Sequence, residues 1–313
     1  MKIAFLYAGQ GSQYVGMGKS IYDHYPTAKT IFDSIKLDFD VKKCCFEGPE
    51  EVLNTTEYTQ PAMVLVANAI TAVLKEKGII PDVVAGLSLG EYSALCASGV
   101  FNPQTGIELV RFRGQVMQEA VKGIDSSMQA VLGLDRETLQ QACIEASKLG
   151  VVEIANYNCP GQLVIAGEKK AVELAGSIAL DLKARRVLPL NVSGPFHTSL
   201  LKDASIKLEE KFKNIEFNEM NIPVVFNTTA TYLKNQESIP TLLEKQVMSS
   251  VYFEDSIRFM INDGVDTFIE IGPGKILSSF VKKIDRNVTL LQIEDQVSLE
   301  NVVTKLKGDN KNV

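Results

Sequence analysis

The chain has 313 residues, of which 45% are hydrophobic and 22% are charged, a composition typical of a soluble globular protein. This length allows one large domain, or a large domain with a smaller one inserted into it. The formal net charge of −6 argues against nucleic-acid binding and favours small-molecule or protein substrates, and it leaves room for a local basic patch that faces an acidic partner.

The cysteines and the apolar runs indicate the compartment. None of the five cysteines forms a C-x-x-C pair, and this pattern favours a reducing, cytoplasmic environment. With two histidines and no cysteine pair, a structural metal site is not expected. The apolar run at 3–7 is too short for a signal peptide, and no later run approaches the length of a membrane span. We therefore expect a cytoplasmic protein that does not bind membranes.

Strands and helices alternate along the first part of the chain, which indicates a mainly parallel sheet. The pattern predicts a strand at 3–7, a glycine-rich turn at 9–12 and helical stretches up to 33. A long helix is predicted over 60–77, with Pro61 in its first turn. A short strand at 83–85 and a helix closed by Gly99 follow, and then a helix from Pro103 to about Val121.

The stretch from 128 to 191 has a different order of elements. It predicts a strand, a helix, two strands, a helix and a strand, over 128–134, 137–148, 151–157, 162–166, 169–183 and 186–190. This β-α-β-β-α-β order is that of a ferredoxin-like unit. Because the strand pattern resumes at 223–227 and 267–271, we interpret the unit as an insertion into a larger α/β domain. The polar residues 307–313 are expected to form a loose tail.

Ser88 is the candidate nucleophile. It lies in Gly86-Leu87-Ser88-Leu89-Gly90, between an apolar strand and a helix, which is the arrangement of a nucleophile elbow. The short motif also occurs by chance, so the strand and the helix beside it are what favour this interpretation. Such a turn exposes the hydroxyl at a helix N-terminus, where free backbone N–H groups can hold an oxyanion.

A catalytic serine needs a base, and the chain offers two histidines. His197 follows Gly194 and Pro195 and precedes a helix expected over 199–212, whereas His24 lies among polar residues, as an exposed structural histidine would. We favour His197 as the general base, and a buried structural histidine is the alternative. No aspartate between Ser88 and His197 stands at a clear strand end, so we predict a Ser-His dyad with a backbone carbonyl on the second ring nitrogen.

Arg113 is expected to point inward. At 100° per residue, the helix over 103–121 places Arg113 on the apolar side and Arg111 on the far side. A guanidinium on an apolar face needs a carboxylate from elsewhere. Either a substrate carboxylate or a distant Asp or Glu of the chain would satisfy it, and the pattern leaves both open.

Two glycine-rich turns do not fit nucleotide-binding motifs. Gly9-Gln10-Gly11-Ser12-Gln13 lacks the G-x-G-x-x-G spacing, and Gly272-Pro273-Gly274-Lys275 lacks the P-loop spacing and is interpreted as a tight strand-to-helix turn. The backbone amide of Gln10 can still complete an oxyanion hole with that of Leu89, because neighbouring parallel strands end along one crevice. No cofactor is expected.

Seven motifs in this order resemble those of the malonyl-CoA:acyl-carrier-protein transacylase family, and the similarity covers nearly the whole chain. They are Gly9-Gln10-Gly11-Ser12-Gln13, Thr59-Gln60-Pro61-Ala62, Gly86-Leu87-Ser88-Leu89-Gly90-Glu91-Tyr92, Arg113-Gly114 with Met117-Gln118, Asn156-Tyr157-Asn158 with Pro160-Gly161-Gln162, Phe196-His197, and Gly272-Pro273-Gly274-Lys275.

The resemblance implies a fold and a division into domains. An α/β-hydrolase-like catalytic domain with a parallel sheet would comprise 1–126 and 192–313, and a ferredoxin-like subdomain would comprise 127–191. The resemblance also implies that Ser88 is acylated, that His197 is the general base and that Arg113 clamps the malonyl carboxylate. Gln10 and Leu89 would donate to the oxyanion.

The resemblance implies further substrate-binding residues. Asn156 and Asn158 would border the thioester, and Gln60 would belong to the same site. Phe196 resembles the residue of members that accept malonyl and exclude methylmalonyl groups, because its ring leaves no space for the methyl group. Two positions depart from the family pattern: Leu87, where His is frequent, and Tyr252, where Gln or Arg is frequent and where a backbone carbonyl could still hold the imidazole.

The implied activity is that of an S-malonyltransferase. Malonyl-CoA would acylate the serine, and the phosphopantetheine thiol of holo acyl carrier protein would then carry malonyl away for fatty-acid synthesis, without metal or redox cofactor. A trans-acting polyketide malonyltransferase, a serine esterase and a non-catalytic acyl-binding protein are the alternatives. An acidic carrier protein would dock near basic residues, which are Lys183, Arg185, Arg186, Lys275, Lys282 and Lys283.

Overall fold

The computed structural model describes residues 1–190, 192 and 194–309. Within this range the chain forms two compact units. The first comprises Met1–Gly114, Phe217–Val225 and Met260–Val313, of which 310–313 lie outside the described residues. The second comprises Gln115–Glu216 and Phe226–Phe259.

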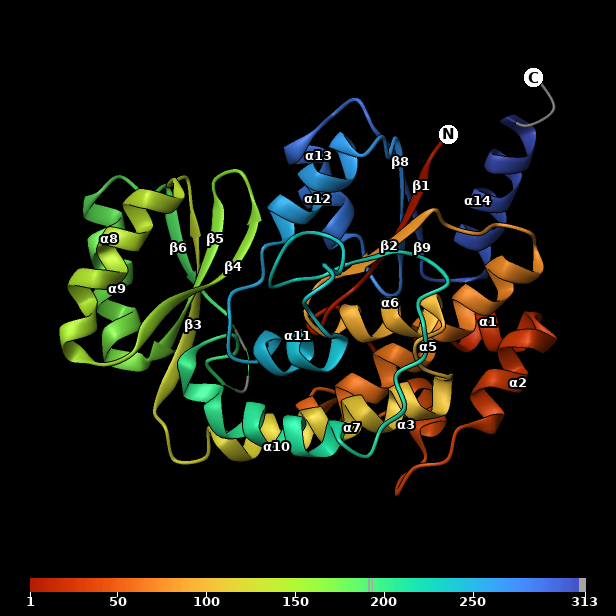
Figure 1. The fold of residues 1–313 in the computed structure, drawn as a ribbon, viewed down its shortest axis with the longest axis horizontal. Coiled ribbons are helices and arrows are strands. Elements are labelled where there is room, and N and C mark those ends of the chain that lie inside the picture. Colours follow the sequence, from red (N-terminus) through yellow and green to blue (C-terminus); the bar gives the residue numbers. More distant parts are fainter. Residues whose placement is uncertain (191, 193, 310–313) are drawn as a thin grey trace. The chain divides into compact units, whose positions relative to one another are not determined.

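A five-stranded parallel sheet forms the centre of the first unit. Its strands follow the order β7 (Val224–Val225), β2 (Val83–Gly86), β1 (Ile3–Tyr7), β8 (Thr267–Ile271) and β9 (Thr289–Ile293). Figure 1 labels four of these strands, β1, β2, β8 and β9. Every residue of β1, β2 and β8 is buried, as expected for parallel strands covered by helices on both faces. The register pairs Tyr7 with both Gly86 and Ile271, so the turns after these three strands leave the sheet along one edge.

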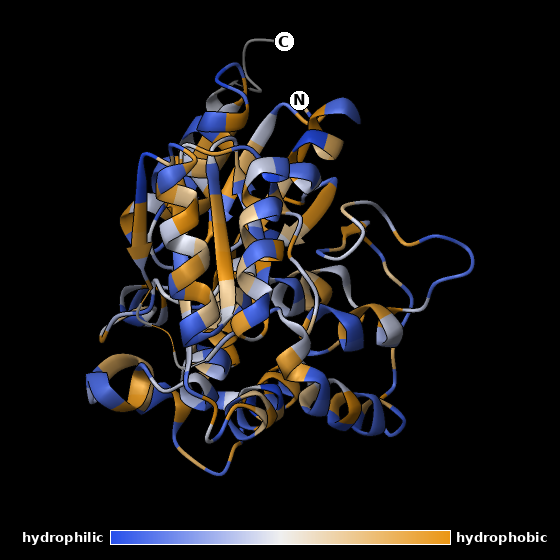
Figure 2. Ribbon diagram, turned by 90° about the vertical axis from the view of Figure 1, so that its left-hand side faces the viewer, coloured by the Kyte–Doolittle hydropathy of each residue, from blue (hydrophilic) through white to orange (hydrophobic). Residues whose placement is uncertain are grey.

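Helices make up most of the remaining first unit. They are α1 (Lys19–His24), α2 (Pro26–Ser34), α3 (Val41–Glu47), α4 (Glu50–Leu53), α5 (Thr56–Glu76), α6 (Gly90–Ser98), the first two thirds of α7 (Pro103–Ala120), α13 (Ile276–Ile284) and α14 (Gln296–Asp309). Helix α12 (Phe253–Asn262) begins in the second unit and ends in the first. In Figure 2 the strands are mostly orange, whereas the helices carry both orange and blue residues, as helices with one buried and one exposed side do.

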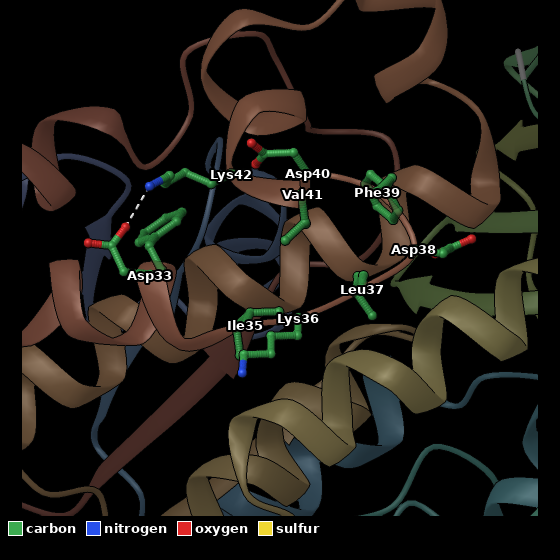
Figure 3. Close-up of a pocket in the computed structure, with 10 residues that line it drawn as sticks. Asp33, Ile35, Lys36, Leu37, Asp38, Phe39, Asp40, Val41 and Lys42 are labelled. Atoms are coloured by element: carbon green, nitrogen blue, oxygen red, sulfur yellow. Dashed lines mark hydrogen bonds and ion pairs between the residues drawn. The ribbon is translucent and has the colours of Figure 1, made fainter.

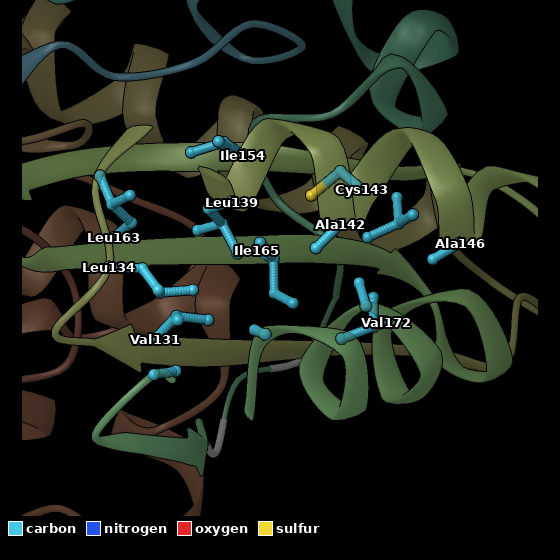
Figure 4. Close-up of a cluster of buried hydrophobic side chains, with 14 of the residues drawn as sticks. Val131, Leu134, Leu139, Ala142, Cys143, Ala146, Ile154, Leu163, Ile165 and Val172 are labelled. Atoms are coloured by element: carbon cyan, nitrogen blue, oxygen red, sulfur yellow. The ribbon is translucent and has the colours of Figure 1, made fainter. Parts of the chain in front are cut away.

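An antiparallel sheet forms the core of the second unit. The strand order is β4 (Val152–Cys159), β5 (Gln162–Glu168), β3 (Ser126–Leu132) and β6 (Arg186–Pro189). Helices α8 (Arg136–Ala146) and α9 (Lys169–Asp181) place apolar side chains against it; Figure 4 shows Leu139 and Val172 beside Ile165 of β5. The elements thus follow the predicted β-α-β-β-α-β order, with a 3-10 turn (Ser147–Leu149) after α8. The 3-10 turn Ser199–Leu201, α10 (Lys202–Phe212) and α11 (Ile239–Gln246) complete the unit.

The α/β fold with a parallel sheet and a separate antiparallel sheet is confirmed, and two strand predictions match to the residue, at 3–7 and 267–271. The predicted domain boundaries remain a prediction. The compact unit that holds the antiparallel sheet includes 127–191 and further residues on both sides of that range. The last predicted strand before the loop of His197 ends at Pro189, and Asn191 and Ser193 lie outside the described residues.

Three expectations were wrong. Helix α5 begins at Thr56, so Pro61 stands inside it as the sixth residue and not in the first turn. The expected loose tail is partly helical, because α14 continues to Asp309; residues 310–313 lie outside the described part of the chain. The sheet also gains β9, a short strand that the sequence pattern did not indicate, and β7 has two residues in place of the five expected.

Candidate active site

Ser88 lies in a strained turn between β2 and α6. Its φ of 53° falls in the left-handed region, which a non-glycine residue adopts at an energetic penalty. The glycines on either side are required by close packing of backbones. A Cβ at Gly86 would lie 2.0 Å from the carbonyl carbon of Gly90, and a Cβ at Gly90 would lie 2.1 Å from the carbonyl oxygen of Tyr7. The predicted strand-turn-helix is therefore present, and Ser88 is half-buried at the start of α6.

The turn after β1 lies against this elbow. The backbone N–H of Leu87 donates to the carbonyl of Tyr7 at 3.1 Å, and a Cβ at Gly9 would lie 2.7 Å from the carbonyl oxygen of Leu87. Within the described part of the chain, no protein group accepts a hydrogen bond from the backbone N–H of Gln10 or of Leu89. Both N–H groups are thus available to an oxyanion near Ser88.

Arg113 points inward from α7, as the helical period predicts. Its side chain is 1% exposed. The guanidinium donates to the Ser88 hydroxyl oxygen at 3.2 Å and to Gln60 Oε1 at 3.0 Å, and it lies 5.5 Å from the centre of the Tyr92 ring. Burial lowers the pKa of Arg113, and the nearby Tyr92 and Glu91 oppose that shift. A buried cation beside the candidate nucleophile is suited to an anionic group bound there.

Two residues of α5 connect to this cluster. Gln60, 1% exposed, accepts the hydrogen bond from Arg113, and Thr56 accepts one from Gln10 Nε2 at 3.0 Å. The first turns of α5 thereby contact both the predicted carboxylate clamp and the predicted oxyanion donor.

His197 belongs to the second unit and is buried there, at 4% exposed. It too has a left-handed backbone, with φ of 63°. Its Nδ1 lies 2.8 Å from the carbonyl oxygen of Gln246, and its backbone N–H donates to the carbonyl of Val247. A carbonyl oxygen only accepts, so Nδ1 carries a proton and Nε2 of the neutral ring keeps its lone pair. His24, in contrast, is exposed, and its Nδ1 lies 2.9 Å from the carbonyl oxygen of Ser20 in its own helix.

The carbonyl on the imidazole comes from Gln246 and not from Tyr252. Tyr252 instead donates its N–H to the carbonyl of Asn227 and stacks its ring on Tyr157, with ring centres 4.9 Å apart. Gln246 is the last residue of α11, and sequence patterns gave no signal that this helix end would meet His197, which precedes it by 49 positions.

Three further candidates lie in the second unit. Asn156 and Asn158, on β4, are 8% and 7% exposed, and Phe196 is 8% exposed. The pairing of β4 with β5 is irregular just before Asn156 and again at Asn158, between Tyr157 and Cys159. The side-chain oxygen of Asn158 is buried and accepts no hydrogen bond from any described residue, which is unusual for a native structure outside a binding site.

The structure brings Arg113 into direct contact with both Ser88 and Gln60, and Gln10 and Leu89 lie on the turns beside Ser88. His197, Asn156, Asn158 and Phe196 belong to the other compact unit.

Arg111 is a buried residue that the sequence analysis placed on the outer side of its helix. It is 8% exposed, and it contacts Asp38 and Glu57 at 2.9 and 2.6 Å. The helical period describes one helix in isolation, and here the segment around Asp38 and the start of α5 cover the side that was expected to face water.

Neither a metal site nor a membrane span is found in the described residues. No group of three or more His, Cys, Asp or Glu side chains there could hold a metal ion, and no helix is long and apolar enough to cross a membrane. All five cysteines are free thiols.

Comparison with known proteins places the chain in a class. Residues 4–313 match the family model described as Acyl transferase domain, so the chain belongs to the acyl transferase family. Its relatives narrow this class. Malonyl CoA-acyl carrier protein transacylase of Bacillus subtilis (strain 168) is 43% identical, over 99% of each chain. The crystal structure of malonyl CoA-acyl carrier protein transacylase from Clostridium perfringens is 45% identical, with a TM-score of 0.96 over 99% of this chain and 98% of that one.

A second similar structure contains a partner protein. It is described as a type II PKS acyl-carrier protein in complex with its malonyl-transacylase, and it is 38% identical with a TM-score of 0.94, over 97% of this chain and 100% of that one.

Proposed function

We propose that this chain transfers a malonyl group from malonyl-CoA to the phosphopantetheine thiol of a holo acyl carrier protein, through a malonyl ester on Ser88. The observation that carries the proposal is the buried guanidinium of Arg113, 3.2 Å from the Ser88 hydroxyl oxygen. A malonyl group on Ser88 ends in a carboxylate a few bonds away, and Arg113 is the charge that would pair with it. The names of the relatives support the same reaction.

In the first half-reaction, Ser88 attacks the thioester carbonyl while Nε2 of His197 takes the hydroxyl proton. The backbone N–H groups of Gln10 and Leu89 hold the oxyanion that forms. The carbon–sulfur bond then breaks, and the CoA thiolate leaves with the proton from His197. The products are CoA thiol and malonyl-Ser88, so atoms and protons balance.

The second half-reaction runs this sequence in reverse with another thiol. His197 takes the proton of the phosphopantetheine thiol, the sulfur attacks the Ser88 ester, and the proton returns to the Ser88 oxygen as the ester bond breaks. The contact between His197 Nδ1 and the Gln246 carbonyl supports this role, because it leaves Nε2 as the basic nitrogen in each half-reaction. No aspartate is required for this orientation.

The remaining candidates contribute to substrate selection. Gln60 orients Arg113, and the unpaired oxygen of Asn158, together with Asn156, suits an N–H group near the thioester. Phe196, which is buried, would exclude a methyl branch on the malonyl group through the bulk of its ring, and this would favour malonyl over methylmalonyl.

The carrier protein would bind through exposed basic residues. Lys183, Arg185 and Arg186 are exposed in the second unit, and Lys275, Lys282 and Lys283 are exposed in the first. Opposite charge accelerates association with an acidic partner. The solved complex of a related malonyl-transacylase with its acyl-carrier protein supports an acyl carrier protein as the partner. We place the reaction in the cytoplasm, where it supplies extension units for fatty-acid synthesis; a polyketide carrier protein is the alternative partner.

Intact-mass measurement tests the function. After mixing with malonyl-CoA, the chain should gain the mass of one malonyl group, and holo carrier protein should then remove it. A serine esterase would release free malonate instead, and a non-catalytic acyl-binding protein would show no covalent gain. Either of these outcomes would refute the proposal.

A further inference from the structure

Pro61 leaves a gap in the hydrogen bonding of α5. A helical residue at this position would donate its N–H to the carbonyl four residues earlier, which is that of Glu57, but proline has no N–H. The guanidinium of Arg111 takes this place from outside the helix. Its Nη1 donates to the Glu57 carbonyl at 3.1 Å and lies 2.6 Å from the Glu57 carboxylate.

The guanidinium of Arg111 also contacts residues other than Glu57. Its Nε and Nη2 donate to the two carboxylate oxygens of Asp38 at 3.2 and 2.9 Å. The rings of Phe39 and Tyr58 lie 4.9 and 4.5 Å from the guanidinium carbon. Figure 3 shows Asp38 and Phe39 on the segment that joins α2 to α3. The contacts with Asp38 use Nε and Nη2, and the contact of Nη1 with the Glu57 carbonyl is separate from them.

The first turns of α5, where Arg111 supplies the missing hydrogen bond, are also the part of the helix that contacts the proposed site. Gln60, one residue before the proline, accepts the hydrogen bond from Arg113. Helices α5 and α7 also approach closely here, since a Cβ at Gly114 would lie 2.6 Å from the Cα of Glu57. Two arginines of α7 therefore reach α5 on either side of this close approach: Arg111 reaches Glu57, and Arg113 reaches Gln60.

We infer that Arg111 is a positioning residue for malonyl selectivity: it completes α5 at the Pro61 gap so that Gln60 holds Arg113 in place to receive the substrate carboxylate. The inference rests on the proposed function, because it assigns Arg111 a role in the selectivity of that same reaction. Arg111 would act through Gln60 and Arg113, without contacting Ser88 or the substrate.

The test compares kcat/KM for malonyl-CoA and acetyl-CoA, with the same holo carrier protein as acceptor. In Arg111→Met the malonyl-to-acetyl ratio of kcat/KM should fall about fivefold or more, mainly through a higher KM for malonyl-CoA. The reason is that displacement of Arg113 weakens the binding only of the substrate that has a carboxylate. Arg111→Lys, which keeps a donor for the Glu57 carbonyl, should recover part of the ratio. If Arg111 only stabilised the fold, its replacement would lower kcat/KM equally for malonyl-CoA and acetyl-CoA.

Two further variants make the test specific. Asp38→Asn weakens the contact of the same arginine with the loop and leaves its contact with α5, so the ratio should stay within about twofold of wild type. Pro61→Ala restores the missing N–H, so Arg111→Met in that background should regain most of the lost ratio. Thermal unfolding of each variant confirms that it is folded.

Three results would overturn the inference even if the wild-type chain transfers malonyl. They are an unchanged malonyl-to-acetyl ratio in folded Arg111→Met, a fall of the ratio in Asp38→Asn as large as that in Arg111→Met, and no recovery of the ratio when Arg111→Met is combined with Pro61→Ala. A wild-type chain that does not transfer malonyl would instead refute the proposed function, and the inference with it.

Discussion

The guanidinium of Arg113 lies 3.2 Å from the hydroxyl oxygen of Ser88. Arg113 is on α7 and Ser88 is on the turn before α6, 25 positions apart in sequence, and both belong to the first compact unit. A permanent positive charge next to a strained serine makes a site that favours an acyl group with a second, anionic end.

Replacing Arg113 should change substrate preference more than chemistry. In Arg113→Ala we expect kcat/KM for malonyl-CoA to fall by about a hundredfold, because a carboxylate in that position would lose its charged partner. Acetyl transfer should fall far less, because acetyl has no carboxylate. Steady-state kinetics with both thioesters measures this, and equal losses would argue against a carboxylate clamp.

Gly90 should not tolerate a side chain. The Cβ of Gly90→Ala would lie 2.1 Å from the carbonyl oxygen of Tyr7, so β1 and α6 would have to separate. We expect the free energy of unfolding to drop by about 2 kcal/mol or more, with loss of Ser88 acylation. Gly308→Ala is a matched control, since nothing lies within 4 Å of its Cβ. Denaturant unfolding distinguishes the two variants, and similar stabilities would contradict the packing described for the elbow.

Glu270 should make stability depend on pH. Burial raises the pKa of this carboxyl in the folded state, although the backbone N–H groups of Leu277 and Ser278 donate to it. The folded state therefore binds the proton more tightly than the unfolded state does. Stability from this group is fully present below the unfolded pKa of glutamate and is lost as pH rises through the higher folded pKa.

The Glu270→Gln variant isolates this effect. Unfolding free energies measured across that pH range should fall more steeply with rising pH in wild type than in the variant. Parallel curves would show that the carboxyl titrates alike in the folded and unfolded states.

Charge reversal tests the carrier-protein surface. Changing Lys183, Arg185 and Arg186 to Glu should raise the KM for holo carrier protein and weaken its salt dependence, and malonyl loading of Ser88 by malonyl-CoA should be unchanged. The same change at Lys275, Lys282 and Lys283 tests the first unit separately. If both triple variants keep the wild-type KM, the carrier protein binds elsewhere.

Sequence patterns predicted the local features of the site well. The glycines around Ser88 indicated a strained turn because only close backbone packing requires them in that spacing, and the helical period placed Arg113 inward because one face of α7 is apolar. Both signals are local: each depends on residues within a turn or two of the chain.

What sequence patterns missed depends on contacts between distant segments. The Gln246 carbonyl that holds His197 is a backbone atom, which any residue type can provide, so no side-chain pattern marks it. Arg111 was expected to be exposed because its partners, Asp38 and Glu57, lie on other elements. The start of α5 was misplaced because Pro61 normally marks a first turn, and here a side chain from another helix supplies the hydrogen bond that the proline lacks.

The most direct test of the account is to locate the acyl group on the protein. The chain is mixed with malonyl-CoA, quenched in acid, digested and mapped by tandem mass spectrometry. We expect one malonyl ester, on Ser88, which disappears when holo carrier protein is added before the quench, together with strongly reduced labelling in His197→Ala. A malonyl group on another residue, or malonyl transfer to the carrier protein with no covalent intermediate on Ser88, would contradict the account.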